Sequence, residues 1–241
     1  MRAQNGSDVT NQIIAIIPAA GSGTRMGLQQ AKQFADLGGR PILEVTLSRF
    51  QECDLVDKII LVVSQQDIDY CTREIIERYK LSKVYKVIAG GKRRQDSVRK
   101  GLESITRFHG LVLIHDGVRP FVSSEFLKRI ITAGSRFRAV IAGLPVKETI
   151  KEVDSKGWVV KSIQRKHVWS IQTPQIFRYD DINRAHQQAL RHRWEEATDD
   201  ALLLEKMGIP VTIIEGKEHN IKITTPQDIE IARLLISKKS S

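Results

Sequence analysis

The stretch IIAIIPAAGSGTRMG, residues 13–27, joins a continuous apolar run to a loop of small residues. The run at residues 13–17 is rich in β-branched side chains, as is typical of a strand buried on both faces of a parallel sheet. Glycines and alanines in residues 18–27 let the backbone turn tightly and bring N–H groups close to an anion. We therefore expect the first strand of an α/β fold, followed by a ligand-binding loop.

Three kinds of phosphate-binding loop compete for residues 18–27. A P-loop needs Gly-x-x-x-x-Gly-Lys-Ser/Thr, which this loop lacks. A dinucleotide fingerprint needs an earlier third glycine and an acid at the end of the second strand, where Val63 and Ser64 stand. The third kind binds a triphosphate through Arg25 and the nearby Lys32, which suit the charge that grows as pyrophosphate leaves. On this motif alone, a plain strand-to-helix turn stays open.

Apolar runs like the first recur at residues 58–63, 83–88, 111–115 and 139–144, with helical spacing between them. This alternation predicts a Rossmann-like α/β fold, in which helices flank a mostly parallel sheet. A length of 241 residues suits a single domain over residues 1–241.

Two helix boundaries follow from local signals. The spacing of Val98 and Leu102 predicts a helix, which Asp96 or Ser97 would cap. The closing helix is expected to begin at Pro226, because proline suits a first helical turn.

The stretch ETIKEVDSKGWVVKSI, residues 148–163, alternates apolar and polar side chains around a turn at residues 154–157. This pattern predicts a β-hairpin. Because an isolated hairpin is marginally stable in water, the arm at residues 145–165 is expected to pack on another surface. A second copy of the chain is the natural candidate, so we expect a homodimer.

The chain carries 38 Lys and Arg against 28 Asp and Glu, a net charge of +10, which favours an anionic partner. Charge alone does not separate nucleic acid from a phosphorylated small molecule, but no known nucleic-acid module is evident. Cys53 and Cys71 are too few for a disulfide framework or a zinc site. Apolar runs are too short to cross a membrane, and the polar N-terminus does not resemble a signal peptide, so a cytoplasmic location is expected.

The segment GGKRRQDS, residues 90–97, follows the third predicted strand and opens a helix. It offers a second set of backbone N–H groups to an anion or a base. Lys92 and Arg93 within it are interpreted as solvated surface charges.

The segment HDGVRP, residues 115–120, closes the fourth predicted strand. An Asp at the carboxyl end of such a strand points into the crevice where open α/β sheets bind ligands. Asp116 therefore needs a ligand, a metal or a hydrogen-bond donor, because a carboxylate leaving an apolar strand is otherwise unpaired. His115 is interpreted as a half-buried histidine with satisfied hydrogen bonds.

Eight motifs in order resemble the 2-C-methyl-D-erythritol 4-phosphate cytidylyltransferases of the non-mevalonate isoprenoid pathway. They run from about Ile14 to the final helix and read PAAGSGTRM, KQF, GGxxRxDSV, HDGVRPF, PVKETIK, RxxxWxxQTPQxF, ATDDA and NIKIT. The resemblance implies transfer of the cytidylyl group of CTP to methylerythritol phosphate. The products would be 4-diphosphocytidyl-2-C-methyl-D-erythritol and pyrophosphate, with Mg²⁺ held mainly by the CTP phosphates.

The same resemblance implies roles for individual residues. Arg25 and Lys32 match the pair that stabilises the transition state, and Arg165 and Lys222 match the pair that holds the sugar phosphate. The nucleotide-binding positions are Pro18, Ala19, Ala20, Gly21, Gly23, Gly91, Ser97 and Gly117. The substrate-binding positions are Asp116, Arg119, Thr149, Thr173 and Thr198. Because the family exchanges its hairpin arm between subunits, Thr149 and Arg165 are expected to complete the partner's site.

The chemistry agrees with this interpretation. A phosphate monoester is already a nucleophile at neutral pH, so the protein has to hold two polyanions together and stabilise charge at phosphorus, which requires Arg and Lys. From the residues alone, however, Lys222 is equally compatible with an edge strand and Arg165 with a surface charge.

Other functions stay open. A ribitol 5-phosphate cytidylyltransferase would share the fold and reaction, although Ala19-Ala20-Gly21 favours methylerythritol phosphate over the Ala-Gly-Gly typical of that group. Sugar-1-phosphate nucleotidyltransferases are usually longer. A non-enzymatic nucleotide-binding dimer or a nucleic-acid-binding protein would belong to a different class. Ala31, Lys92 and Gly117 depart from the residues frequent in the resembled family, which puts affinity in question more than activity.

Overall fold

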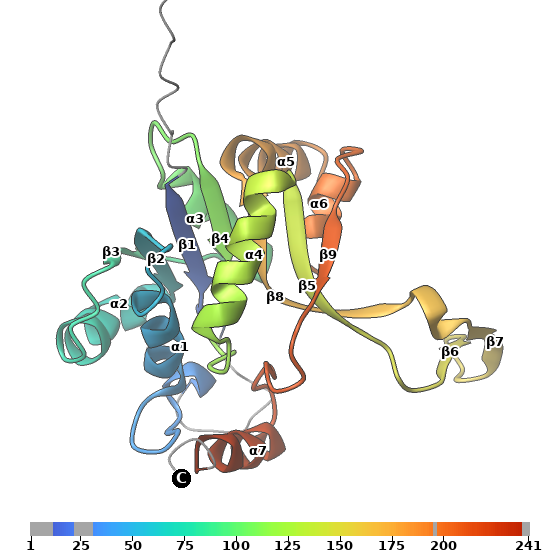
Figure 1. Ribbon diagram of the computed structural model, residues 1–241, viewed down its shortest axis with the longest axis horizontal. Helices are drawn as coiled ribbons and strands as arrows, with labels where there is room; N and C mark the ends of the chain where they lie inside the picture. Colours follow the sequence, from blue (N-terminus) through green and yellow to red (C-terminus); the bar gives the residue numbers. More distant parts are fainter. Residues whose placement is uncertain (1–11, 22–30, 195–196, 238–241) are drawn as a thin grey trace, which may run out of the picture.

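The computed structural model describes residues 12–21, 31–194 and 197–237. Within these residues, seven strands form one sheet in the order β3-β2-β1-β4-β8-β5-β9 (Figure 1). Only β8 runs antiparallel to its neighbours in this described sheet, so the predicted mostly parallel sheet is confirmed. The strands are β1 (Ile13–Pro18), β2 (Lys58–Val63), β3 (Val84–Ala89), β4 (Leu111–Ile114), β5 (Ala139–Pro145), β8 (Trp169–Arg178) and β9 (Thr212–Glu215).

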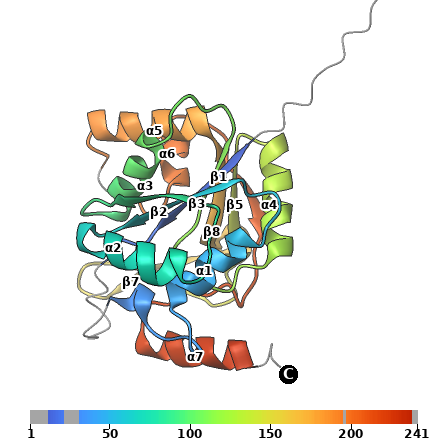
Figure 2. The same cartoon turned by 90° about the vertical axis from the view of Figure 1, so that its left-hand side faces the viewer.

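Helices cover both faces of the sheet, and α2 continues into a π-helical segment, Cys71–Glu77. The helices are α1 (Ile42–Gln51), α2 (Ile68–Tyr70), α3 (Arg94–Glu103), α4 (Ser124–Arg136), α5 (Tyr179–Arg191), α6 (Ala201–Glu205) and α7 (Pro226–Ser237). One apolar cluster joins the sheet to α1 and α4, and the other joins it to α3, α5 and α6 (Figure 2). None of the helices in the described part of the chain is long and apolar enough to cross a membrane.

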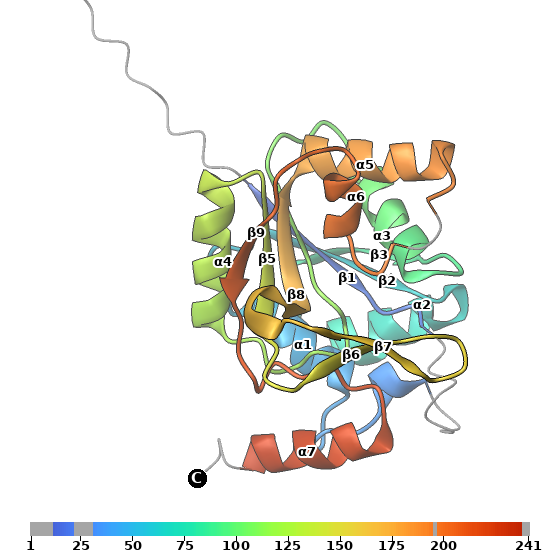
Figure 3. The ribbon, with the colours of Figure 1, turned by 90° about the vertical axis from the view of Figure 1, so that its right-hand side faces the viewer.

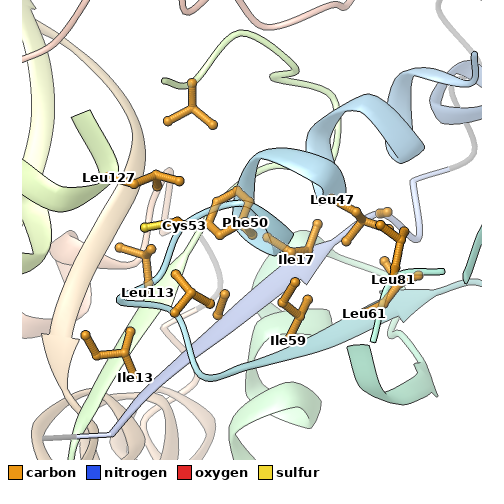
Figure 4. Packing of buried hydrophobic residues seen from close by; sticks show 14 of the residues in the cluster. Ile13, Ile17, Leu47, Phe50, Cys53, Ile59, Leu61, Leu81, Leu113 and Leu127 are labelled. Carbon is orange, nitrogen blue, oxygen red and sulfur yellow. The ribbon is translucent and has the colours of Figure 1, made fainter. Parts of the chain in front are cut away.

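Strand β1 shows why its sequence is apolar at every position. Ile13 and Ile17 lie in the first cluster, whereas Ile14 and Ile16 lie in the second. Successive side chains of a strand point to opposite faces, so a strand between two helical layers buries all of them. Figure 4 shows Ile17 beside Phe50 of α1 in the first cluster, and Ile13 farther along the strand near Leu113.

A third, smaller cluster holds α7 beneath the sheet. Ile229 and Ala232 of α7 are buried against Val118 and Phe121, which follow β4, and against Ile223. The Ile223 N–H also donates to the Val118 carbonyl at 2.9 Å. The C-terminal helix therefore fixes the loops that follow β4 and precede α7.

The predicted hairpin is confirmed as a separate antiparallel pair, β6 (Ile150–Val153) and β7 (Val159–Ile163). It lies on an arm that projects from the body in Figure 1 and faces the viewer in Figure 3. Its turn is closed at Asp154, whose carbonyl accepts from Gly157 at 3.1 Å and whose carboxylate accepts from the N–H of Trp158 at 2.9 Å. Within the described residues, neither β6 nor β7 pairs with a strand of the main sheet.

Neither Asp96 nor Ser97 is the N-cap residue of α3, because the helix begins at Arg94 and its N-cap is Arg93. Asp96 caps the helix from its third position, where its carboxylate accepts a hydrogen bond from the N–H of Arg93 at 3.3 Å as one half of a capping box. Ser97 uses its hydroxyl on Gly91, whose N–H donates to it at 3.1 Å. Both side chains thus serve the preceding loop from within the first helical turn.

Candidate active site

A cavity of about 210 Å³ lies at the carboxyl ends of β1 and β4. The sheet order places β2 and β3 on one side of β1 and β4 on the other, so the side on which the chain adds its strands switches between β1 and β4. Ligands of open α/β sheets bind at such a switch point. Its walls come from both glycine-rich loops: Pro18, Ala19, Ala20, Gly21, Gly91, Lys92, Arg93, Arg94 and Ser97, with Lys32, Gln33, Asp116, Val118 and Lys222.

The two loops are held side by side by backbone hydrogen bonds to β2. The Ala19 N–H donates to Val62 and the Gly90 N–H donates to Val63, both at 2.7 Å. A Cβ atom at residue 90 would lie only 2.5 Å from the Cβ of Ala20. Position 90 therefore requires glycine, because the loops approach too closely for a side chain.

Asp116 is the charged centre of this cavity. Its Oδ1 accepts from Arg94 Nε at 2.8 Å, and its Oδ2 lies 2.9 Å from Lys222 Nζ and 3.6 Å from Arg119 Nε. Burial of the carboxyl group opposes ionisation, but Arg94, Lys222 and Arg119 outweigh it and hold the pKa of Asp116 well below its usual range. The buried Asp116 carboxylate is therefore paired with three cations: Arg94, Arg119 and Lys222.

Arg94 also reaches a second buried carboxylate. Its Nη1 donates to Asp200 Oδ2 at 2.7 Å, and His186 Nε2 donates to Asp200 Oδ1 at 3.2 Å. Burial disfavours the charged guanidinium, but Asp200 and Asp116 raise the pKa of Arg94 above its ordinary value. No role was predicted for Arg94 from the sequence, although its position in the GGxxRxDSV motif was a signal.

His115 is completely buried, not half-buried as expected, but its hydrogen bonds are satisfied. A carbonyl only accepts, so Nε2 donates to the Arg119 carbonyl at 3.0 Å, and Nδ1 accepts from the Thr173 hydroxyl at 3.2 Å. Burial lowers the pKa of His115 to about 4. The ring is therefore neutral at pH 7 and braces the loop that carries Asp116.

A second cavity of about 230 Å³ shares Arg94, Asp116 and Lys222 with the first. Its further walls are Arg119, Ile171, Gln172, Thr173, Gln175, Thr198 and Asp199. Asn220 supports it, accepting from Arg119 Nη1 through its carbonyl at 2.9 Å and donating to the Thr173 carbonyl at 2.8 Å. Apart from Thr149, the predicted substrate-binding positions thus lie together.

Thr149 and Arg165 lie on the exposed arm and line neither cavity. Arg165 donates to the Lys147 carbonyl at the base of the arm. Gly117 does not line the first cavity but lies beneath it, where an added Cβ would be 2.9 Å from Ala19 Cβ. Arg25 and Gly23 lie outside the described residues.

Lys92 and Arg93 are exposed, as interpreted, but they also line the rim of the first cavity. Lys222 belongs to no strand in the described chain, since the segment that carries it is an extended loop ahead of α7. The edge-strand interpretation of Lys222 is therefore wrong.

Among the described residues, no group of three or more His, Cys, Asp or Glu is placed to hold a metal ion. Asp116 is the carboxylate that lines the described wall of the first cavity, and both its oxygens face cations. The cations of this wall suit a polyanionic ligand, and the described side chains do not form a metal-binding cage. A hard divalent cation would take its ligands from phosphate oxygens.

Such an arrangement defines a nucleotide-binding α/β protein, because two tight loops present backbone N–H groups beside cations at the switch point of the sheet. The family model for 2-C-methyl-D-erythritol 4-phosphate cytidylyltransferase matches residues 13–238. The chain belongs to this family of nucleotidyltransferase enzymes.

Named relatives agree over nearly the whole chain. The enzyme of this name from Clostridium botulinum (strain Eklund 17B / Type B) is 43% identical over 226 residues, covering 94% of this chain and 100% of the relative. That of Syntrophus aciditrophicus is 42% identical over 228 residues, covering 95% and 97%.

Solved structures show the same fold. The 4-diphosphocytidyl-2C-methyl-D-erythritol synthase of Anaerococcus prevotii has a TM-score of 0.82 and 35% identity, covering 95% of this chain and 97% of that one. The cytidylyltransferase of Francisella tularensis has a TM-score of 0.79 and 31% identity, covering 92% and 99%.

Proposed function

We propose that this chain transfers the cytidylyl group of CTP to 2-C-methyl-D-erythritol 4-phosphate in isoprenoid precursor biosynthesis. The observation that carries the proposal is the pair of adjoining cavities that share Arg94, Asp116 and Lys222. One cavity offers backbone loops for a nucleotide, and the other offers cations and hydroxyls for a phosphorylated polyol. Family membership supplies the substrates.

In the reaction, an oxygen of the methylerythritol phosphate attacks the α-phosphorus of CTP. The new bond joins that oxygen to phosphorus, and the bond from the α-phosphorus to the bridging oxygen breaks, which releases pyrophosphate. The phosphate monoester needs no general base, and His115 is not available as one, since it is buried and both its ring nitrogens are hydrogen-bonded within the protein. The protein contributes alignment of the two substrates and cations for the developing charge.

The nucleotide is assigned to the first cavity. The segment Pro18 to Gly21 and the opposed Gly91 and Ser97 lie where a cytidine nucleotide would contact backbone and small side chains. Lys32, which lines the same cavity, would act with Arg25 on the α-phosphate. Both cations favour the transition state because its phosphate oxygens carry more charge than those of the ground state.

The sugar phosphate is assigned to the second cavity. Lys222 and Arg119 supply charge there, and the hydroxyls of Thr173 and Thr198 supply hydrogen bonds to polyol oxygens. Lys222 lines both cavities, so it can hold the nucleophilic phosphate next to the α-phosphate.

Mg²⁺ is proposed as the divalent cation that accompanies CTP. It would neutralise phosphate charge while bound to the nucleotide, since the described residues offer it no cage. Lys32 and Lys222 would act beside it as fixed positive charges of the protein itself.

The arm is proposed to form a homodimer. Trp158, Val159, Val160 and Val153 are each more than half exposed, which is apolar surface that a partner subunit would bury. Thr149 and Arg165 would then reach the partner's second cavity. A cytoplasmic location stays a prediction.

Pyrophosphate release with CTP and Mg²⁺ tests the proposal, with methylerythritol phosphate and ribitol 5-phosphate as parallel acceptors. Turnover with the first acceptor is expected. Turnover with ribitol 5-phosphate alone would replace the acceptor but keep the reaction. A lack of turnover with both acceptors would contradict the enzymatic function.

A further inference from the structure

We propose that Arg94 is a positioning residue, which holds Asp116 so that Lys222 stays available to the sugar phosphate. This inference rests on the proposed function, because it assigns Arg94 an indirect part in that reaction.

Arg94 occupies one oxygen of Asp116 and leaves the other to the remaining cations. Its Nε is 2.8 Å from Oδ1, whereas Lys222 and Arg119 both face Oδ2. The side chain of Lys222 is 38% exposed, so its ammonium group faces the cavities as well as Asp116. Arg94 thus limits Lys222 to a single carboxylate oxygen.

Arg94 is itself held from its far side. Asp200, whose side chain is 1% exposed, accepts from Nη1 of Arg94 at 2.7 Å and also from His186 of α5. The guanidinium therefore bridges two carboxylates through two different nitrogens in one plane. A lysine has a single nitrogen on a flexible stem and does not reproduce this geometry.

Loss of this bridge would free the Asp116 carboxylate to turn about its Cβ–Cγ bond. Both of its oxygens would then be open to Lys222 and Arg119, which would draw the Lys222 ammonium toward Asp116 and away from the sugar phosphate. Small displacements of a reacting group have large kinetic effects, because alignment supplies much of the rate.

The test compares Arg94→Lys with a matched control, Arg99→Lys. Both arginines are on α3, their side chains are 27% and 21% exposed, and Arg99 lines neither cavity and pairs with Glu103 at 2.8 Å and with Asp96 at 3.8 Å. Arg94→Lys is expected to lower kcat/KM for methylerythritol phosphate about 100-fold. Its Kd for CTP, measured by calorimetry, is expected to stay within about threefold, and Arg99→Lys is expected to match the wild type.

A double variant separates positioning from general damage. If Arg94 acts through Asp116 on Lys222, then Arg94→Lys/Lys222→Met should be within about threefold of Lys222→Met alone. Two losses that multiply would overturn the proposal, as would an unimpaired Arg94→Lys enzyme.

Circular dichroism and the melting temperature check the fold of each variant. If Arg94→Lys does not fold, Asp200→Asn takes its place, because it frees the far end of Arg94 and keeps the pair with Asp116. Its expected loss is about 10-fold, again absent in the Lys222→Met background. The wild-type assay is the separate test of the proposed function, since an inactive wild type would refute that function and not the ion-pair geometry.

Discussion

The Lys222 ammonium nitrogen lies 2.9 Å from Oδ2 of Asp116, which joins the loop ahead of α7 to the loop after β4. This contact brings a cation from near the end of the chain into the crevice built by β1 and β4. The third apolar cluster makes it possible, because Val118, Ile223 and Ile229 pack together below it. Charge placement in this site therefore depends on a small core outside the main sheet.

Replacing Asp116 by Asn should leave three cations without their shared counter-charge. We expect kcat/KM to fall on the order of 100-fold because Lys222 loses its anchor. We also expect about 3 kcal/mol less unfolding free energy, because a buried pair has lost one partner. Asp54→Asn is the control, since Asp54 pairs with Lys128 on the exposed surface. Unchanged activity in Asp116→Asn would contradict the role of this carboxylate.

His115 should make the protein sensitive to acid. Burial lowers its folded-state pKa to about 4, whereas the unfolded value is about 6.5, so the unfolded state binds the proton more tightly. Stability from the neutral ring is present above about pH 6.5 and falls by about 3 kcal/mol as the pH drops to about 4.

Chemical denaturation at several pH values measures this effect. The slope between those pH values should flatten in His115→Gln and persist in His109→Gln, because His109 is exposed. An equal slope in both variants would exclude His115 as the source.

Gly90→Ala should push the two loops of the first cavity apart. The new methyl group would lie 2.5 Å from Ala20 Cβ and 2.7 Å from Ser97 Oγ. We expect CTP affinity to fall about 10-fold or more, since 1.4 kcal/mol already gives that factor. Adding Ala20→Gly removes one of the two clashes and should restore part of the affinity in a CTP titration. A second variant with no recovery would argue against the predicted contact.

Ala31→Pro should stabilise the segment ahead of Lys32. Ala31 has φ −60° and ψ 134°, which proline adopts without strain. We expect a gain of about 0.4–1 kcal/mol in unfolding free energy with activity kept, because the unfolded chain loses freedom. Thermal unfolding and the pyrophosphate assay measure the two effects. A lower melting temperature would show that the backbone before Lys32 does not tolerate the ring.

The arm allows a complementation test of the dimer. If Arg165 serves the partner's site, Arg165→Ala and Asp116→Asn should each be nearly inactive alone. Unfolding and refolding them together in equal amounts should restore about a quarter of the wild-type sites, since half of the dimers are mixed and each has one intact site. Light scattering on Trp158→Asp should show weaker self-association. If mixing restores no activity, Arg165 does not serve the partner's site: it acts in the site of its own subunit or has no part in the reaction.

Local patterns in the sequence were enough to predict β1, its loop, the parallel strands and the hairpin. Each of these features depends on residues that are neighbours along the chain. The continuous apolar run at residues 13–17 indicates burial on two faces, and the turn at Asp154 indicates a hairpin. The start of α3 was missed by a few residues, because Asp96 reaches back to the Arg93 N–H from inside the helix.

The tertiary structure alone decided which charges meet. β8 lies between β4 and β5 and runs antiparallel to both, and this long-range pairing cannot be predicted from its own residues. Arg94, Asp116, Asp200 and Lys222 come from four separate segments, and only packing of those segments brings their charges within hydrogen-bond distance. Periodicity along a chain reports which faces are buried, whereas an ion-pair network depends on distances between segments that periodicity does not contain.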